Sequence, residues 1–172
     1  MGIGHCALGF PAKKLAPKVP LGILLLATMV LDILAIGFAW AGIERVGAGN
    51  PWSHGLLMSV IWSLAAALLG WRIFGEQRAG AVIGLLVFSH WVLDFISHPI
   101  PFPSFSWRTW HWEYGRPLPA DLPLLFGGSP RVGLGLYNRI SAVEATVLEL
   151  GMLIAGIAWY ARSAPARLRS ED

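Results

Sequence analysis

The stretch GAVIGLLVFSHWVLDFIS, residues 80–97, decides the fold class of this chain. It is long and apolar enough to cross the hydrocarbon core of a bilayer as an α-helix, yet it contains His90 and Asp94. It opens with Gly80-x-x-x-Gly84, a spacing that lets two membrane helices approach closely. The stretch therefore predicts a membrane helix that packs tightly on a neighbour and carries two ionisable side chains.

Three more apolar runs on either side of this helix, which we place at residues 80–98, are long enough to span a bilayer. They cover residues 20–43, 54–74 and 140–161. Ser53 is a suitable N-cap for the run that starts at residue 54. We therefore predict an all-α, polytopic membrane bundle of about four transmembrane helices, in a single domain of residues 1–172.

The segment of residues 99–139 differs from the rest of the chain. It is rich in proline and tryptophan, carries mixed charges and contains no run that could span a membrane. It predicts an irregular outer loop with its large aromatic side chains at the headgroup level, namely Trp107, Trp110, Trp112 and Tyr114.

The composition agrees with a membrane protein. Hydrophobic residues make up 55% of the chain and charged residues 13%, whereas a soluble domain carries about 25% charged residues. The net charge of +3 comes from scattered basic residues beside apolar runs, which indicates membrane lipids and not nucleic acid as the partner. Cys6 is the one cysteine, so an internal disulfide and a cysteine-based zinc knuckle are both excluded.

Charge asymmetry predicts the orientation of the bundle. With four spans both termini lie on one side, and that side carries the larger number of basic residues in short segments. By the positive-inside rule we place the termini in the cytoplasm and the protein in the cell membrane. The residues on the cytoplasmic side would be Lys13, Lys14, Lys18, Arg72, Arg78, Arg162, Arg167 and Arg169.

His90 and Asp94 form the strongest candidate for a functional pair. They are four residues apart on one helix, so they share a face. An imidazole and a carboxylate in this arrangement can hold a divalent metal ion. Alternatively, Asp94 orients His90 through a hydrogen bond without any metal.

Two other residues are candidate ligands for the same site, Asp32 in the middle of the first span and His54 at the start of the second. Asp32 and His90 would lie roughly 13–15 Å below the outer surface of the membrane, whereas His54 would lie near that surface, because it begins its helix there. A shared site therefore requires a water-filled pocket or a second helix that starts below the surface. His5 could join only if residues 1–12 fold back into the bilayer.

Glu149 lies in the last span at a depth similar to that of His90. It could be a ligand, a general base or a protonated packing residue. Glu144 is nearer the outer edge and is expected to be solvated, while His111 is expected to be structural or interfacial.

Several stretches together resemble a family of small bacterial integral membrane proteins, the membrane-bound metal-dependent hydrolases, which are related in pattern to zinc-dependent phospholipase C. The stretches are MGIGHCALGFPAKKLAP (1–17), LGILLLATMVLDIL (21–34), PWSHGLLMSVIW (51–62), GLLVFSHWVLDFISHP (84–99) and RVGLGLYN (131–138). The resemblance implies a helical bundle with a metal site formed by His5, Asp32, His54, His90 and Asp94. It also implies that Gly55 replaces a serine whose hydroxyl could contact His54.

Three hypotheses follow. In the first, the chain is a metal-dependent hydrolase, with zinc as the preferred divalent ion, Glu149 as the catalytic base and a lipid or phosphoester as substrate. In the second it is a small permease or a proton- or ion-handling protein, which would be expected to form a homo-oligomer. In the third, the polar residues only lock helix packing.

Overall fold

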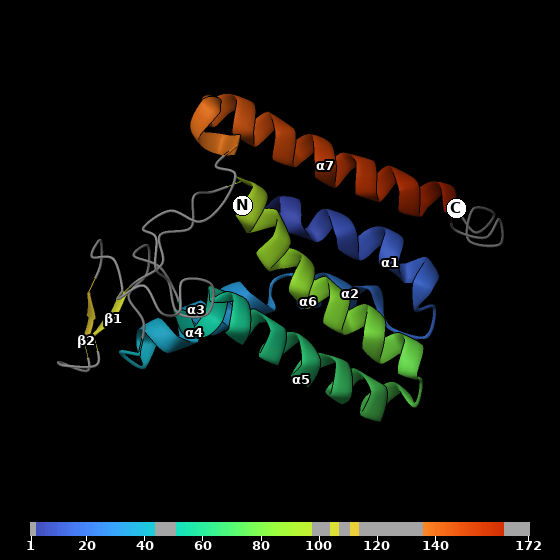
Figure 1. Cartoon of the computed structure of the whole chain (residues 1–172). Helices are drawn as coiled ribbons and strands as arrows, with labels where there is room; N and C mark the ends of the chain where they lie inside the picture. Colours follow the sequence, from blue (N-terminus) through green and yellow to red (C-terminus); the bar gives the residue numbers. More distant parts are fainter. Residues whose placement is uncertain (1–2, 44–50, 98–103, 107–110, 114–135, 164–172) are drawn as a thin grey trace.

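The computed structural model describes residues 3–43, 51–97, 104–106, 111–113 and 136–163. Helices make up nearly all of this part of the chain, and the predicted all-α class is confirmed (Figure 1). The main helices are α1 (Gly9–Leu15), α2 (Leu21–Thr28), α3 (Val30–Trp40), α4 (Pro51–His54), α5 (Leu56–Phe74), α6 (Gln77–Ser97) and α7 (Ala142–Ser163), with short 3-10 helices η1 (Ile3–Leu8) and η2 (Leu136–Arg139).

Three of the described helices are long and apolar enough to cross a membrane: α5, α6 and α7. The pair α2 and α3 adds a fourth crossing if the two are counted as one bent span. The prediction of about four spans agrees with this upper count, and the boundaries of the last three predicted helices differ from the observed ones by a few residues at most.

The prediction of one continuous first helix over residues 20–43 is wrong. The chain bends by 58° between α2 and α3, at Met29. No proline or glycine causes the bend. At the end of α2 the Thr28 hydroxyl donates a hydrogen bond to the carbonyl oxygen of Leu25 at 2.7 Å, a local contact that competes with the backbone hydrogen bonds of a helix.

The predicted close packing at Gly80 and Gly84 is confirmed. A Cβ atom on Gly80 would lie 2.4 Å from the carbonyl oxygen of Ala67, and one on Gly84 would lie 2.8 Å from that of Ser63. Because both positions lack a side chain, the backbones of α5 and α6 come into direct contact, as small residues permit in membrane helices.

The N-terminal segment, η1 and α1, lies inside the bundle between α7 and α2 (Figure 1). Gly156 of α7 contacts its backbone so closely that an added Cβ would lie 2.5 Å from the carbonyl oxygen of Ala7. The simple topology of four spans, which leaves residues 1–19 outside the bundle, is therefore incomplete. In Figure 1 the first described residues lie at the opposite end of the bundle from the end of α7, so the prediction that both termini share one side overlooks this segment.

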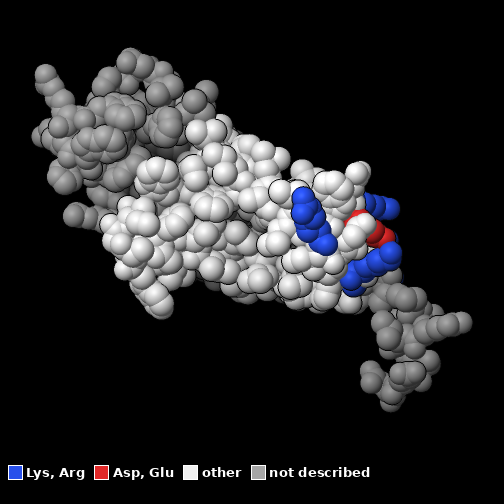
Figure 2. Space-filling view, turned by 90° about the horizontal axis from the view of Figure 1, so that it is seen from below, with Lys and Arg blue, Asp and Glu red and all other residues white. Residues whose placement is uncertain are grey.

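Charged side chains gather at one end of the molecule, beside the end of α7, while the rest of the visible described surface is uncharged (Figure 2). Lys13 and Lys14 lie in the last turn of α1, Arg72 in the last turn of α5 and Arg162 in the last turn of α7. Apolar side chains such as Leu64, Leu85 and Ile154 are about two-thirds exposed on the helix flanks. An apolar flank with charges at one end is the surface that a bilayer requires.

Two helix starts differ from expectation. Ser53 is not the N-cap of the second span, because α4 includes it and Gly55 separates α4 from α5. The last span begins with a capping box that we had not predicted: Ser141 N and Oγ donate to Glu144 at 2.7 and 2.8 Å. Glu144 is exposed, as expected.

Most of the predicted loop of residues 99–139 lies outside the described residues, including Trp107, Trp110 and Tyr114. The described parts hold η2 and a short antiparallel pair, β1 (Ser104–Ser106) with β2 (His111–Glu113). This pair was not predicted. Trp112 and His111 belong to β2.

Candidate metal centre

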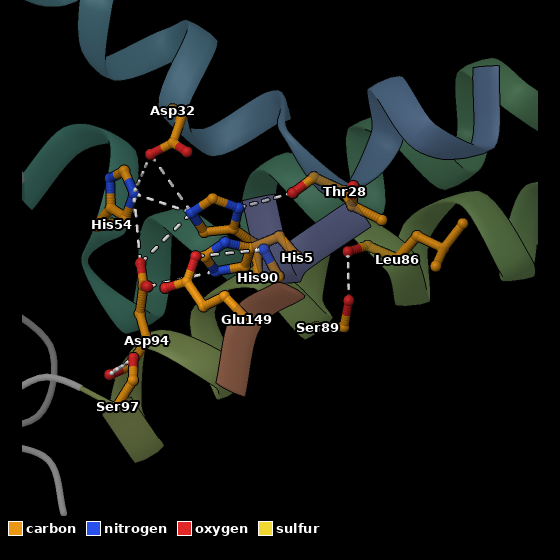
Figure 3. Close-up of polar contacts among 11 residues, drawn as sticks. His5, Thr28, Asp32, His54, Leu86, Ser89, His90, Asp94, Ser97 and Glu149 are labelled. Carbon is orange, nitrogen blue, oxygen red and sulfur yellow. Dashed lines mark hydrogen bonds and ion pairs between the residues drawn. The ribbon is translucent and has the colours of Figure 1, made fainter. Parts of the chain in front are cut away.

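Four ionisable side chains from three parts of the chain meet inside the bundle (Figure 3). Asp32 comes from α3, His54 from α4, and His90 and Asp94 from α6. Their nearest atoms are 3.3–3.6 Å apart. We call these four residues the His–Asp centre.

The break at Gly55 removes the mismatch in depth that the sequence suggested for His54. His54 ends α4, a separate helix before α5, so its ring does not have to lie at the outer surface where a straight span would begin. Its Nε2 atom lies 3.3 Å from Nε2 of His90. The break between α4 and α5 thus brings the two rings together, while the depth of the centre in a membrane stays a prediction.

The spacing of these atoms fits the ligands of one metal ion. In a tetrahedral zinc site with bonds of about 2.0–2.2 Å, neighbouring ligand atoms lie roughly 3.3–3.6 Å apart. Asp32 Oδ1 lies 3.4 and 3.5 Å from the Nε2 atoms of His54 and His90. Asp94 Oδ2 lies 3.6 and 3.4 Å from the same two atoms. Each carboxylate thus forms, with the two imidazoles, a triangle of the size that surrounds a metal ion.

These distances are also longer than direct ion-pair hydrogen bonds, which measure about 2.7–2.9 Å. Imidazole nitrogens and carboxylate oxygens that face one another without a cation or a proton between them would repel. The donor set therefore fits a divalent ion, and the described His and Asp side chains could hold one.

The ring of His90 is oriented by the bend in the first span. Its Nδ1 atom donates a hydrogen bond to the carbonyl oxygen of Thr28 at 2.6 Å. Thr28 ends α2, where the last carbonyls lack partners within the helix. Because Nδ1 carries the hydrogen, the neutral ring presents the lone pair of Nε2 to the His–Asp centre, which is how metal-binding histidines are usually held.

His54 has a corresponding partner in its neighbour. Its Nδ1 atom lies 2.8 Å from the Ser53 hydroxyl, and both residues are buried. Gly55, which follows His54, has no hydroxyl to offer the ring. Ser53, which precedes His54, provides the hydroxyl contact instead.

Of the four side chains of the His–Asp centre, that of Asp32 is the most exposed. The His90 side chain is fully buried and those of His54 and Asp94 are 11% exposed, whereas the Asp32 side chain is 37% exposed. The core residues Leu31 of α3 and Val87 of α6 are fully buried in the helices that carry Asp32, His90 and Asp94. A molecule that reaches the centre would approach along Asp32.

His5 meets the condition set by the sequence, because η1 folds back into the bundle. Its Nε2 atom lies 3.3 Å from Oδ1 of Asp94, the carboxylate oxygen that does not face His54. Its ring stacks on that of His90, with centroids 3.8 Å apart and planes inclined by 10°. His5, His90 and Asp94 form a second group that could hold a metal ion.

Glu149 reaches the same region from α7. Its carboxylate accepts a hydrogen bond from the backbone nitrogen of Gly4 at 3.4 Å, next to His5 (Figure 3). Tyr137 of η2, which was not predicted as a site residue, contacts Glu149. Burial raises the pKa of Tyr137 to about 12, and the negative charge of Glu149 adds to the rise. Tyr137 therefore stays protonated and can donate to Glu149; its place in RVGLGLYN was the one signal in the sequence that could have drawn attention to it.

Comparison with known proteins found no family model, no curated protein and no solved structure that matches the chain. The resemblance to membrane-bound metal-dependent hydrolases thus stays a prediction from the sequence.

Proposed function

We propose that this protein is a metal-dependent hydrolase of the membrane that uses a zinc ion held by the His–Asp centre. The observation that carries the proposal is the pair of ligand-sized triangles that Asp32 and Asp94 form with His54 and His90. Two imidazoles with one carboxylate are a ligand set of catalytic zinc sites. The resemblance to metal-dependent hydrolases, based on the same residues, agrees with it.

The different exposure of the two carboxylates supports catalysis over a purely structural ion. Catalytic zinc sites keep one position for water or substrate, whereas structural sites are closed by four protein ligands. Asp94 is buried and Asp32 is more than a third exposed. We propose that Asp94 and the two histidines hold the ion, and that water or substrate reaches it from the side of the exposed Asp32.

A bound zinc ion would acidify water and polarise a carbonyl or phosphoryl oxygen. In the hydrolysis of an ester, the oxygen of water bonds to the acyl carbon or phosphorus and the bond to the leaving alcohol breaks. We propose that Glu149 accepts the proton lost by the water and returns it to the alcohol. Tyr137 would hold the carboxylate of Glu149 in place. Because the centre lies among membrane helices, a lipid or another amphiphilic ester is the fitting substrate.

Metal analysis of the purified protein tests the proposal. We expect one or more zinc ions per chain in the wild type, and a loss of zinc in His90→Ala and Asp94→Asn. Ser89→Ala is the matched control, because Ser89 neighbours His90 but its hydroxyl donates to the carbonyl oxygen of Leu86, away from the centre. Wild-type protein that contains no zinc, manganese or iron after growth in metal-rich medium would refute the proposal.

The bend between α2 and α3 favours a second candidate, ion transport. Broken membrane helices commonly carry ion sites in transporters, and Asp32 lies directly after this break. In reconstituted liposomes a transporter would produce a zinc or proton flux that is lost in Asp32→Asn. Hydrolysis of ester probes without such a flux would exclude this candidate.

A further inference from the structure

The two oxygens of Asp94 face two different histidines. Oδ2 lies 3.4 Å from Nε2 of His90, and Oδ1 lies 3.3 Å from Nε2 of His5. The two rings are stacked and nearly parallel, 3.8 Å apart. Both Nε2 atoms therefore point the same way, toward one carboxylate that spans the gap between them (Figure 3).

From this arrangement we propose that the protein binds a second divalent ion in front of His5, and that Asp94 bridges the two ions. The proposal rests on the proposed function, because the first ion is the one in the His–Asp centre. His5 would then be a ligand, as the resemblance implies, but of a different ion from the one that His54 and His90 hold.

The stacking distance is the main argument. The ligand atoms of His5, His90 and Asp94 are close enough for one ion, but the two stacked rings cannot both direct their lone pairs at it, since a lone pair lies in the plane of its own ring. Each ring would bind its own ion, and the two ions would be separated by about the ring spacing of 3.8 Å. Two-metal hydrolytic sites have ions about 3.5–4 Å apart.

The contact between His5 and Asp94 also has the length of two ligands of one ion. At 3.3 Å it exceeds the 2.7–3.2 Å of ordinary N–H···O hydrogen bonds and agrees with the separation of ligand atoms in the first site. His5 is fully buried, so water does not screen the electrostatic interaction between its ring and an ion or carboxylate.

Charge then indicates the class of substrate. With one divalent ion, the carboxylates of Asp32, Asp94 and Glu149 outweigh the metal charge, and an anionic substrate would be repelled. A second ion reverses the sign and creates a positive site. The described basic side chains at the ends of α1, α5 and α7 lie at the far end of the bundle and do not supply this charge (Figure 2). We therefore assign a phosphoester as the substrate, since two-metal sites stabilise both the attacking and the leaving oxygen at phosphorus.

The second ion would bind more weakly than the first. His5 and Asp94 Oδ1 supply two ligands, and water or substrate phosphate would complete the shell. Loading the detergent-solubilised protein with manganese gives a direct test, because two bridged Mn²⁺ ions are magnetically coupled. We expect a coupled signal in electron paramagnetic resonance at full loading, and the signal of an isolated ion when less than one equivalent is added.

Variants connect the second ion to His5. His5→Gln, which keeps a polar side chain of similar size, should bind one Mn²⁺ per chain, give no coupled signal and no longer bind inorganic phosphate. Ser89→Ala should keep both ions. Folding of each variant is checked by circular dichroism. If wild-type protein binds a single uncoupled ion at saturation, or if His5→Gln keeps the coupled pair, the second site is refuted.

Failure of this inference can be told apart from failure of the proposed function. One ion with hydrolysis of a neutral carboxylic ester, but not of bis(4-nitrophenyl) phosphate, would leave the proposed function standing and overturn the second ion and the phosphoester. No bound ion at all would overturn both.

Discussion

The two histidines of the His–Asp centre are oriented by different kinds of partner. The Nδ1 atom of His90 is held by a backbone carbonyl, which no side-chain substitution removes, whereas that of His54 contacts the Ser53 hydroxyl. Partners of this kind set both the tautomer and the direction of a ligand ring. Ser53 is therefore the position at which ring orientation can be tested by mutation.

We predict that Ser53→Ala lowers the affinity for zinc by about 10–100-fold, because the His54 ring loses the contact that aims its Nε2 atom at the centre. Competition with a fluorescent chelator measures the change. Ser89→Ala should leave the affinity for zinc unaltered, because Ser89 is a partly buried serine of α6 whose hydroxyl donates to a backbone carbonyl oxygen. Equal affinities in Ser53→Ala and wild type would show that the hydroxyl does not orient His54.

Glu149 and Glu144 provide a matched pair on one helix. Glu149→Gln should lower the hydrolysis rate by about 10²–10⁴-fold, the range for loss of a general base, while the zinc content stays unchanged. Glu144→Gln should leave the rate near that of the wild type, because its carboxylate only caps the start of α7 through Ser141. Loss of zinc in Glu149→Gln would instead identify Glu149 as a ligand.

At the level of helices, the interruptions matter as much as the spans. The bend at Met29 places the carbonyl of Thr28 beside His90 and brings Asp32 to the centre. The interruption at Gly55 turns His54 inward. In a straight helix the Thr28 carbonyl would bond within the helix and the His54 side chain would lie elsewhere. The two interruptions make both groups available to the centre.

The contact between α7 and the N-terminal segment predicts the effect of single methyl groups. Gly156→Ala should destabilise the protein by about 1–3 kcal/mol, because its Cβ would lie 2.5 Å from the carbonyl oxygen of Ala7 and α7 must shift. Gly151→Ala, on the same helix with nothing within 4 Å, should be neutral or stabilising by up to about 1 kcal/mol. Thermal unfolding in detergent compares them, and similar melting temperatures would mean that α7 does not pack on η1 as described.

At the level of the whole molecule, the basic residues of distant segments meet at one end, beside the ion pair of Lys18 with Glu76 at 2.5 Å. This end is the one that the positive-inside rule assigns to the cytoplasm. The His–Asp centre lies further along α6, with His90 about 18 Å from Arg78 at 1.5 Å per residue. The assignment therefore places the centre nearer the outer surface.

Labelling of single cysteines tests this orientation. In a Cys6→Ser background, Leu136→Cys in η2 should react with an impermeant maleimide added outside intact cells, because it lies at the end opposite the basic residues and is exposed. Lys14→Cys should react only after the membrane is opened. The reverse pattern would invert the predicted orientation.

Much of the site was predictable from residue types. His90 and Asp94 share a helix face by their spacing alone, and Asp32 is conspicuous because a charge in an apolar run is costly. The position of His54 relative to them was not predictable, because a regular helix would place it at a different depth. The contact of His5 with Asp94 and the approach of Tyr137 to Glu149 depend on where distant segments pack.

Span length, apolar composition and small-residue spacing are local properties of the chain, and they were enough to predict a bundle of membrane helices. How the polar residues meet depends on tertiary packing. The hydrogen bond of His90 to the Thr28 carbonyl, the approach of His54 to His90 and the close contact of Gly156 with Ala7 all join residues far apart in the sequence. These contacts depend on packing in three dimensions, which no pattern along the chain records.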